Sequence, residues 1–93
     1  MINLYQKTWT EINIEIAKNM VRLRKRKNLS QRELAVRSDV SLGSLKRFEQ
    51  TGEISLQSLT KLAIALGVEE ELGNLFEDVP FDSIEEIIHE QTK

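Results

Sequence analysis

The sequence predicts an all-α protein. One proline and four glycines interrupt the 93 residues, and strand-like alternation of apolar and polar side chains is scarce. Helix-start signals recur along the chain and predict five helices followed by a tail. We expect an N-terminal arm over residues 1–10, one helical domain over residues 11–77, and an acidic tail over residues 78–93 with the signals of a short helix. The length suits a single domain with one modest core.

The first helix is expected to begin near Thr8. Thr8 and Glu11 have the spacing of a capping box, in which two side chains satisfy free amides at a helix start. The helix should end in the basic run of residues 24–27, with Asn28 as its stop. One buried stripe is predicted by four apolar residues at helical spacing, Ile12, Ile16, Met20 and Leu23.

The second and third helices are expected to be short and close together. Ser30 and Glu33 form a second capping box, which predicts a helix over residues 31–38. Ser41 can cap the next helix, which covers about residues 42–50. Only a turn of three or four residues then separates the two helices.

The fourth and fifth helices follow Gly52, which ends the third. Ser55 caps the fourth helix and Gly67 is a natural residue to end it. Its buried stripe consists of Leu59, Leu62, Ala63 and Leu66. The fifth helix is expected over about residues 69–76. Its inward side chains are predicted to be Leu72, Leu75 and Phe76.

The charge of the chain is unevenly distributed. The net charge is −2, but residues 18–50 carry ten cations and three anions, a local charge of +7. Residues 51–93 carry two cations and ten anions, and residues 1–17 add −1. A polyanion responds to the charge within a Debye length, about 8–10 Å at physiological salt. An acidic chain can therefore bind nucleic acid through its basic middle third.

The second and third helices have the spacing of a helix-turn-helix. One residue must be small where such helices cross, and Ala35 is small. The turn must accept a left-handed backbone, which aspartate tolerates better than most residues, and Asp39 stands there. The face that is expected to be buried contains Val40, Leu45 and Phe48. The face that is left outside contains Leu42, Gly43, Lys46 and Arg47.

A long segment of the chain resembles the XRE/Cro-type helix-turn-helix family. The resemblance covers about residues 14–76 and is carried by NLSQRELAVRSDVSLGSLKRFEQTGEISLQSLTKLAIALGV. It implies the five-helix fold of phage repressors and a regulator, typically a repressor, that binds double-stranded DNA as a two-fold dimer. The family usually has glycine where this chain has Asp39, which should cost about 1 kcal/mol and adds a negative charge near the DNA.

The resemblance also implies which side chains meet DNA bases. They are Leu42, Gly43, Ser44, Lys46 and Arg47. Leu42 can touch only a thymine methyl and Gly43 can only permit close approach, so the polar contacts fall to the other three. Arg47 is the best candidate for a bidentate contact to guanine.

Phosphate contacts are expected from residues on both sides of the third helix. They are Arg24, Lys27, Gln31, Arg32, Ser41 and Thr51. Gln31 resembles the family glutamine that bonds a phosphate and braces the third helix. Cations at residues 24–27 also suit the C-terminal end of a helix dipole, so for them phosphate contact and helix stabilisation are both open.

Several other function classes have no support in the sequence. Without cysteine there is no disulfide or thiolate site, which is compatible with a reducing cytoplasm, where we expect the protein to lie. His89 has no catalytic partner, and the acidic run 69–71 suits a helix start better than a metal site. The longest apolar run is the five residues 62–66, far too short to span a membrane, and the start lacks the pattern of a signal peptide. We expect no enzyme activity, metal or cofactor.

Two alternatives to the repressor remain. GSLKRFE, TGEISL and a tail of the type FDSIEEI also resemble HipB-like antitoxins, over fewer residues. That resemblance implies a toxin partner, held through residues 79–93, where Ile84, Ile87 and Ile88 could lie in a groove. Two regions are candidates for the dimer surface. One is the fifth helix with the tail, which the resemblance to the family favours, and the other is the N-terminal arm. The third reading is a motif that no longer binds DNA, which Leu42 and Gly43 keep open.

Overall fold

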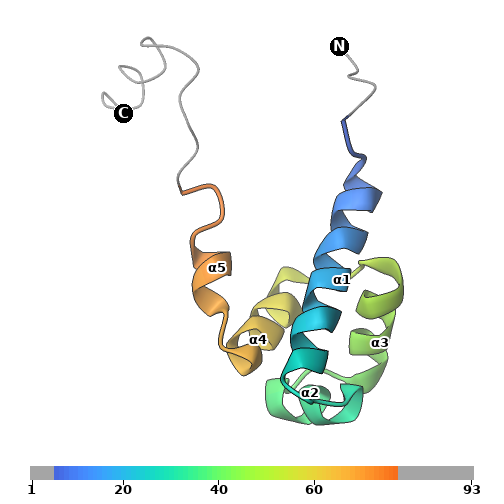
Figure 1. The fold of residues 1–93 in the computed structure, drawn as a ribbon, viewed down its shortest axis with the longest axis vertical. Coiled ribbons are helices and arrows are strands. Elements are labelled where there is room, and N and C mark those ends of the chain that lie inside the picture. The colour runs from blue at the N-terminus through green and yellow to red at the C-terminus, as the bar shows by residue number, and fades with distance from the viewer. Residues whose placement is uncertain (1–5, 78–93) are drawn as a thin grey trace.

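A computed structural model describes residues 6–77, which form five α-helices and no strand (Figure 1). The helices are α1 (Trp9–Arg26), α2 (Gln31–Ser38), α3 (Leu42–Thr51), α4 (Leu56–Leu66) and α5 (Glu69–Gly73). The all-α, five-helix prediction is confirmed. The predicted tail over residues 78–93, including its helix, lies outside the described residues. Within them, no helix combines the length and the hydropathy that a bilayer span requires.

The four longer helices begin where their capping residues predict. The caps Thr8, Ser30, Ser41 and Ser55 each have an extended backbone and accept a hydrogen bond from the amide three residues ahead. At Ser30 both halves of the capping box form, because Glu33 also accepts from the Ser30 amide at 3.1 Å. Three helices end in the left-handed region, at Asp39 (φ 58°), Gly52 (φ 78°) and Gly67 (φ 75°).

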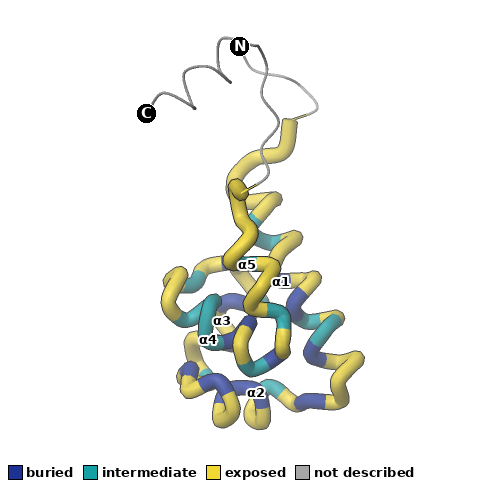
Figure 2. The backbone as a smooth tube through the Cα atoms, turned by 90° about the vertical axis from the view of Figure 1, so that its left-hand side faces the viewer, coloured by how far each residue is buried: buried dark blue, intermediate teal, exposed yellow. Residues whose placement is uncertain are grey.

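The core lies where α1 to α4 meet. Helix α1 packs on α3, α2 packs on both α3 and α4, and α5 contacts α4 (Figure 1). Figure 2 shows the buried stretches gathered among these helices, with α5 exposed along most of its length. The largest fully buried side chains are Leu34, Leu45, Phe48, Leu62 and Leu66. Each such side chain contributes about 1.5–3 kcal/mol by leaving water.

The predicted buried stripe of α1 is wrong in its first half. Ile12 is 44% exposed and Ile16 is 42% exposed. The first turns of α1 extend beyond the other helices, so no helix of residues 6–77 covers this face (Figure 1). The buried residues of α1 lie further along, at Ala17, Met20 and Arg24. The face that enters the core therefore includes an arginine.

Helix α5 is shorter than predicted. It ends at Gly73, and Leu75 and Phe76 are 56% and 87% exposed instead of pointing inward. Gly73 and Asn74 are poor helix formers, and a helix this short has little stability of its own. After them the backbone continues in turns, and Phe76 adopts a left-handed φ of 67°. Only Leu72 of the three predicted residues is partly buried.

Candidate nucleic-acid interface

Helices α2 and α3 are joined by three residues, 39–41. Asp39 takes the left-handed conformation that the turn requires, and the Val40 amide then donates to the Ala35 carbonyl at 3.2 Å. Val40 and Ala35 are 5% and 7% exposed, so a small residue stands where the helices meet. Ser41 closes the turn by capping α3. Two short helices thus meet in the geometry of a helix-turn-helix.

The outer face of α3 is polar and open. Leu45 and Phe48 are buried, whereas Gly43, Ser44, Lys46, Arg47 and Gln50 are exposed. A Cβ added at Gly43 would meet no atom within 4 Å, so the backbone there is accessible to a ligand. The Ser41 hydroxyl donates to the Ser44 hydroxyl at 2.8 Å. Leu42, also expected on this face, is half-buried against the core.

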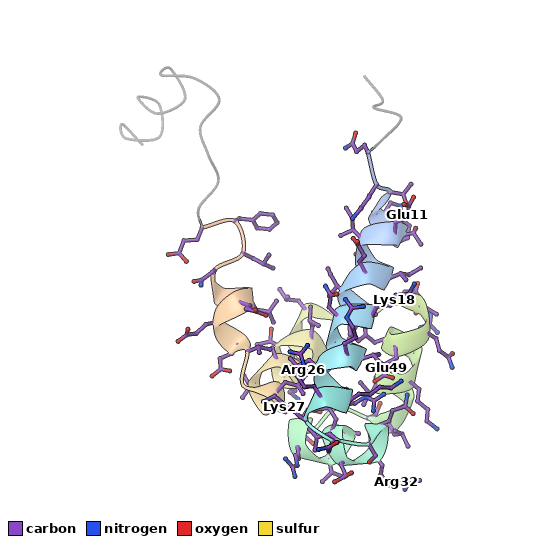
Figure 3. The ribbon with its side chains drawn as sticks, in the orientation of Figure 1. Glu11, Lys18, Arg26, Lys27, Arg32 and Glu49 are labelled. Atoms are coloured by element: carbon purple, nitrogen blue, oxygen red, sulfur yellow. The ribbon has the colours of Figure 1, made fainter. Side chains whose placement is uncertain are left out.

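A buried ion pair fixes α3 against α1. Arg24 donates from Nε and Nη2 to the two carboxylate oxygens of Glu49, at 2.8 and 3.0 Å. Its Nη1 donates to the Leu29 carbonyl at 2.9 Å, and Gln31 Nε2 donates to Glu49 Oε1 at 2.9 Å. The Arg24 and Glu49 side chains are only 9% and 8% exposed. Figure 3 shows Glu49 between α1 and α3.

A family model described as helix-turn-helix matches residues 20–72, which contain this turn and both of its helices. The chain belongs to the helix-turn-helix family. Its type is XRE/Cro, and it is a DNA-binding transcriptional regulator. No match was found among the curated proteins or among the solved structures.

In this helix-turn-helix Arg24 is buried and not exposed to DNA, contrary to the sequence prediction. The sequence predicts that Arg24 contacts a phosphate, but its guanidinium is buried and all three of its nitrogens donate to Glu49 or Leu29. The physical reason is periodicity. Arg24 continues the buried face of Ala17 and Met20 at spacings of three and four residues. Its role in the regulator is to brace α3 from inside.

The other expected phosphate contacts remain accessible. Lys27, Arg32 and Ser41 are exposed, and Figure 3 shows Arg32 pointing into solvent from the first turn of α2. Gln31 is half-buried and already braces α3 through Glu49. Thr51 is exposed, and its Oγ1 donates to the Arg47 carbonyl at 2.7 Å.

Sequence reasoning missed two cations beside the motif. Lys18 and Arg22 of α1 line a shallow groove together with Gln31 and Gln50. Both cations stand four residues apart on the exposed side of α1, next to the buried Ala17 and Met20. That spacing was the available signal, because it predicts a common helix face.

Sequence reasoning also missed the acidic partners of the interface. Glu49 follows the buried Phe48 and lies four residues after Leu45, which was a signal that it faces inward. Glu53 forms an ion pair with Arg47, at 2.7 Å between Nη2 and Oε2. No sequence pattern indicated that pair, since it depends on the shape of the turn after α3. Among residues 6–77, no cluster of three or more acidic or histidine side chains is arranged to hold a metal ion.

Proposed function

We propose that the chain is a sequence-specific repressor that inserts α3 into the major groove of double-stranded DNA. The observation that carries this proposal is the polar, exposed face of α3 inside the basic region of residues 18–50. Lys46 and Arg47 supply the donors, Ser44 adds a hydroxyl, and Gly43 allows close approach of the backbone. An arginine that binds guanine in a bidentate manner gives about 1–3 kcal/mol of discrimination.

Phosphate contacts position α3 in the groove. In this proposal Lys27, Arg32 and Ser41 meet the DNA backbone, and Gln31 donates its second amide hydrogen to a phosphate beside them. Thr51 is not among these contacts, because its hydroxyl proton goes to the Arg47 carbonyl. Each cation that neutralises a phosphate releases counterions, so binding should weaken steeply with salt. Arg24 takes no part in these contacts because it is buried with Glu49.

The regulator is proposed to act as a two-fold dimer. Two copies would place their α3 helices about 34 Å apart, in successive major grooves. Apolar side chains that are exposed in one copy support this assembly. They are Trp9, Ile12 and Ile16 on α1, and Leu75 and Phe76 after α5. The three side chains on α1 stand three and four residues apart, which places them on one helix face, and an exposed apolar face is typical of an interaction surface.

The test is fluorescence anisotropy with labelled DNA from the upstream region of the gene and with scrambled DNA. Wild type should bind the upstream DNA more tightly. Arg47→Ala should weaken that binding by about 5- to 150-fold, which corresponds to 1–3 kcal/mol, and reduce the preference over scrambled DNA. Arg26→Ala is the matched control, because it removes the same charge from the exposed end of α1. Equal effects of the two variants would refute the assignment of Arg47.

A second role as an antitoxin rests on the sequence of the tail. Ile84, Ile87 and Ile88 form an apolar stripe in an acidic segment, which suits an amphipathic helix in a groove of a partner protein. A chain that ends at residue 78 should keep its DNA binding and lose a toxin in co-purification with the product of the neighbouring gene. If the shortened chain instead loses only its dimer, the tail is part of the dimer and the antitoxin role fails.

A further inference from the structure

Arg47, the proposed base reader, is already engaged by a carboxylate. Its Nη2 lies 2.7 Å from Oε2 of Glu53, and the two side chains are 68% and 52% exposed. We propose that Glu53 is a specificity-determining residue that orients the Arg47 guanidinium for guanine. This inference rests on the proposed function, since it concerns how α3 discriminates between DNA sequences.

The turn after α3 holds Glu53 within reach of Arg47. The Thr51 hydroxyl donates to the Arg47 carbonyl at 2.7 Å and accepts from the Glu53 amide at 3.1 Å. One hydroxyl therefore connects the backbone of the reading residue to the backbone of its carboxylate partner. The ion pair is set by this local geometry.

Gly52 prevents the turn from moving away. It is buried and left-handed, with φ 78°, and its amide donates to the Phe48 carbonyl at 2.8 Å. An added Cβ would lie 2.8 Å from the Asn13 carbonyl carbon, so the turn is pressed against the backbone of α1. Helix α1 is in turn fixed to α3 through Arg24 and Glu49. The position of Glu53 is thus held by the Thr51 hydroxyl within the turn and by the packing of Gly52 against α1.

The pair has little value for stability. Exposed ion pairs contribute little to folding, because water and salt screen them. Its value for recognition is larger, because an arginine has five donor hydrogens in a rigid plane. Glu53 accepts from this plane at Nη2 and so orients it, while the remaining donors stay available for guanine O6 and N7.

Glu53 should have opposite effects on specific and nonspecific DNA. Orientation of Arg47 helps only where a guanine is in the matching position. The negative charge of Glu53 repels phosphates on every sequence. Removal of the charge should therefore strengthen binding to scrambled DNA and reduce the ratio of specific to nonspecific affinity.

The experiment compares affinities for upstream and scrambled DNA in wild type, Glu53→Gln, Arg47→Ala and the double variant. We expect Glu53→Gln to reduce the affinity ratio by up to about fivefold, the equivalent of an exposed pair of about 1 kcal/mol. It should also raise the affinity for scrambled DNA. In the Arg47→Ala background the same substitution should leave the ratio unchanged. Glu70→Gln on α5 is the control with an equal change of charge.

Two results would overturn the proposal. An unchanged ratio, with Glu53→Gln folded by circular dichroism, would mean that the pair does not orient Arg47, and an equal gain in affinity for both DNAs would show that Glu53 only repels phosphate. A change in the ratio that persists without Arg47 would assign the effect to another residue. Wild type that binds both DNAs equally would instead refute the proposed function itself, and this inference with it.

Discussion

Gly52 stands where α3 ends and its backbone turns against α1. Its φ is 78°, and an added Cβ would lie 2.8–2.9 Å from backbone and side-chain atoms of Asn13. Gly52→Ala should therefore destabilise the fold through two contributions. They are about 1–2 kcal/mol for the left-handed backbone and about 1–3 kcal/mol for overpacking against Asn13. Urea unfolding of the purified variant measures the sum.

Two other glycines separate these contributions. Gly67 has φ 75° but no atom within 4 Å of an added Cβ, so Gly67→Ala should show only the backbone cost. Gly43 is inside α3 with the same open surroundings, so Gly43→Ala should stabilise by up to about 1 kcal/mol. If Gly52→Ala and Gly67→Ala lose the same stability, the contact with Asn13 does not constrain the turn.

Glu33 gives the fold a dependence on pH. The backbone amide of Ser30, and next its hydroxyl, hold the pKa of Glu33 below its ordinary value of 4.5, with a smaller contribution from Arg37. Because the folded pKa is depressed, the stabilisation is present above about pH 4.5 and is lost as the pH falls through the folded value. The stability advantage of wild type over Glu33→Gln should narrow from pH 7 to pH 3 in urea unfolding. A gap that does not change with pH would contradict this account.

At the scale of elements, α3 contributes one residue to each of two arginine–glutamate pairs, which lie in contrasting surroundings. The Arg24–Glu49 pair is buried and the Arg47–Glu53 pair is exposed. Glu49→Gln leaves Arg24 as a buried charge without its partner and should cost about 3–5 kcal/mol, whereas Glu53→Gln should cost less than about 1 kcal/mol. Urea unfolding of both variants makes the comparison.

A double-mutant cycle tests the same coupling. Each single variant, Arg24→Met or Glu49→Leu, leaves one buried charge without its partner, whereas the double variant leaves none. The double variant should therefore lose less stability than the sum of the two single losses. Purely additive losses would mean that the two side chains act independently, despite bonds of 2.8 and 3.0 Å.

The boundaries of the four longer helices could be predicted because they depend on local chemistry. Ser30, Ser41 and Ser55 cap helices within three residues of themselves, and Asp39 and Gly52 supply the left-handed turns. The burial of each helix face is harder to predict from the sequence, since it depends on which helix lies opposite. The periodicity of α1 is the same along its length, but among the described residues only its later turns contribute buried side chains, at Ala17, Met20 and Arg24. The exposure of Ile12 and Ile16 therefore could not be predicted from the sequence.

The site was predictable to a similar extent. Lys46, Arg47 and Ser44 are on the exposed face that their spacing from Leu45 and Phe48 requires. What the charge pattern could not reveal is which cations are already paired. Arg24 and the cations near it look alike in sequence, and only the packed structure removes Arg24 from the surface.

At the scale of the whole molecule, the location of charge should decide how the protein meets DNA. The net charge is −2, yet all but the last residue of the helix-turn-helix lies within residues 18–50, which carry +7. The acidic run 69–71 lies on α5, across α1 from α3 in Figure 1. Charges there are screened from a duplex at α3 if they lie beyond a Debye length of about 8–10 Å.

Two substitutions of equal size test this separation. Arg32→Gln removes a cation from the first turn of α2, beside α3, and should reduce the slope of log Kobs against log salt by about 0.9. Arg32→Gln should lower the affinities for upstream and scrambled DNA by the same factor, because a phosphate contact carries no sequence information. Glu70→Gln shifts the net charge by one unit the other way and should leave the slope unchanged. If Glu70→Gln strengthens binding as much as Arg32→Gln weakens it, net charge governs the affinity and the local potential does not.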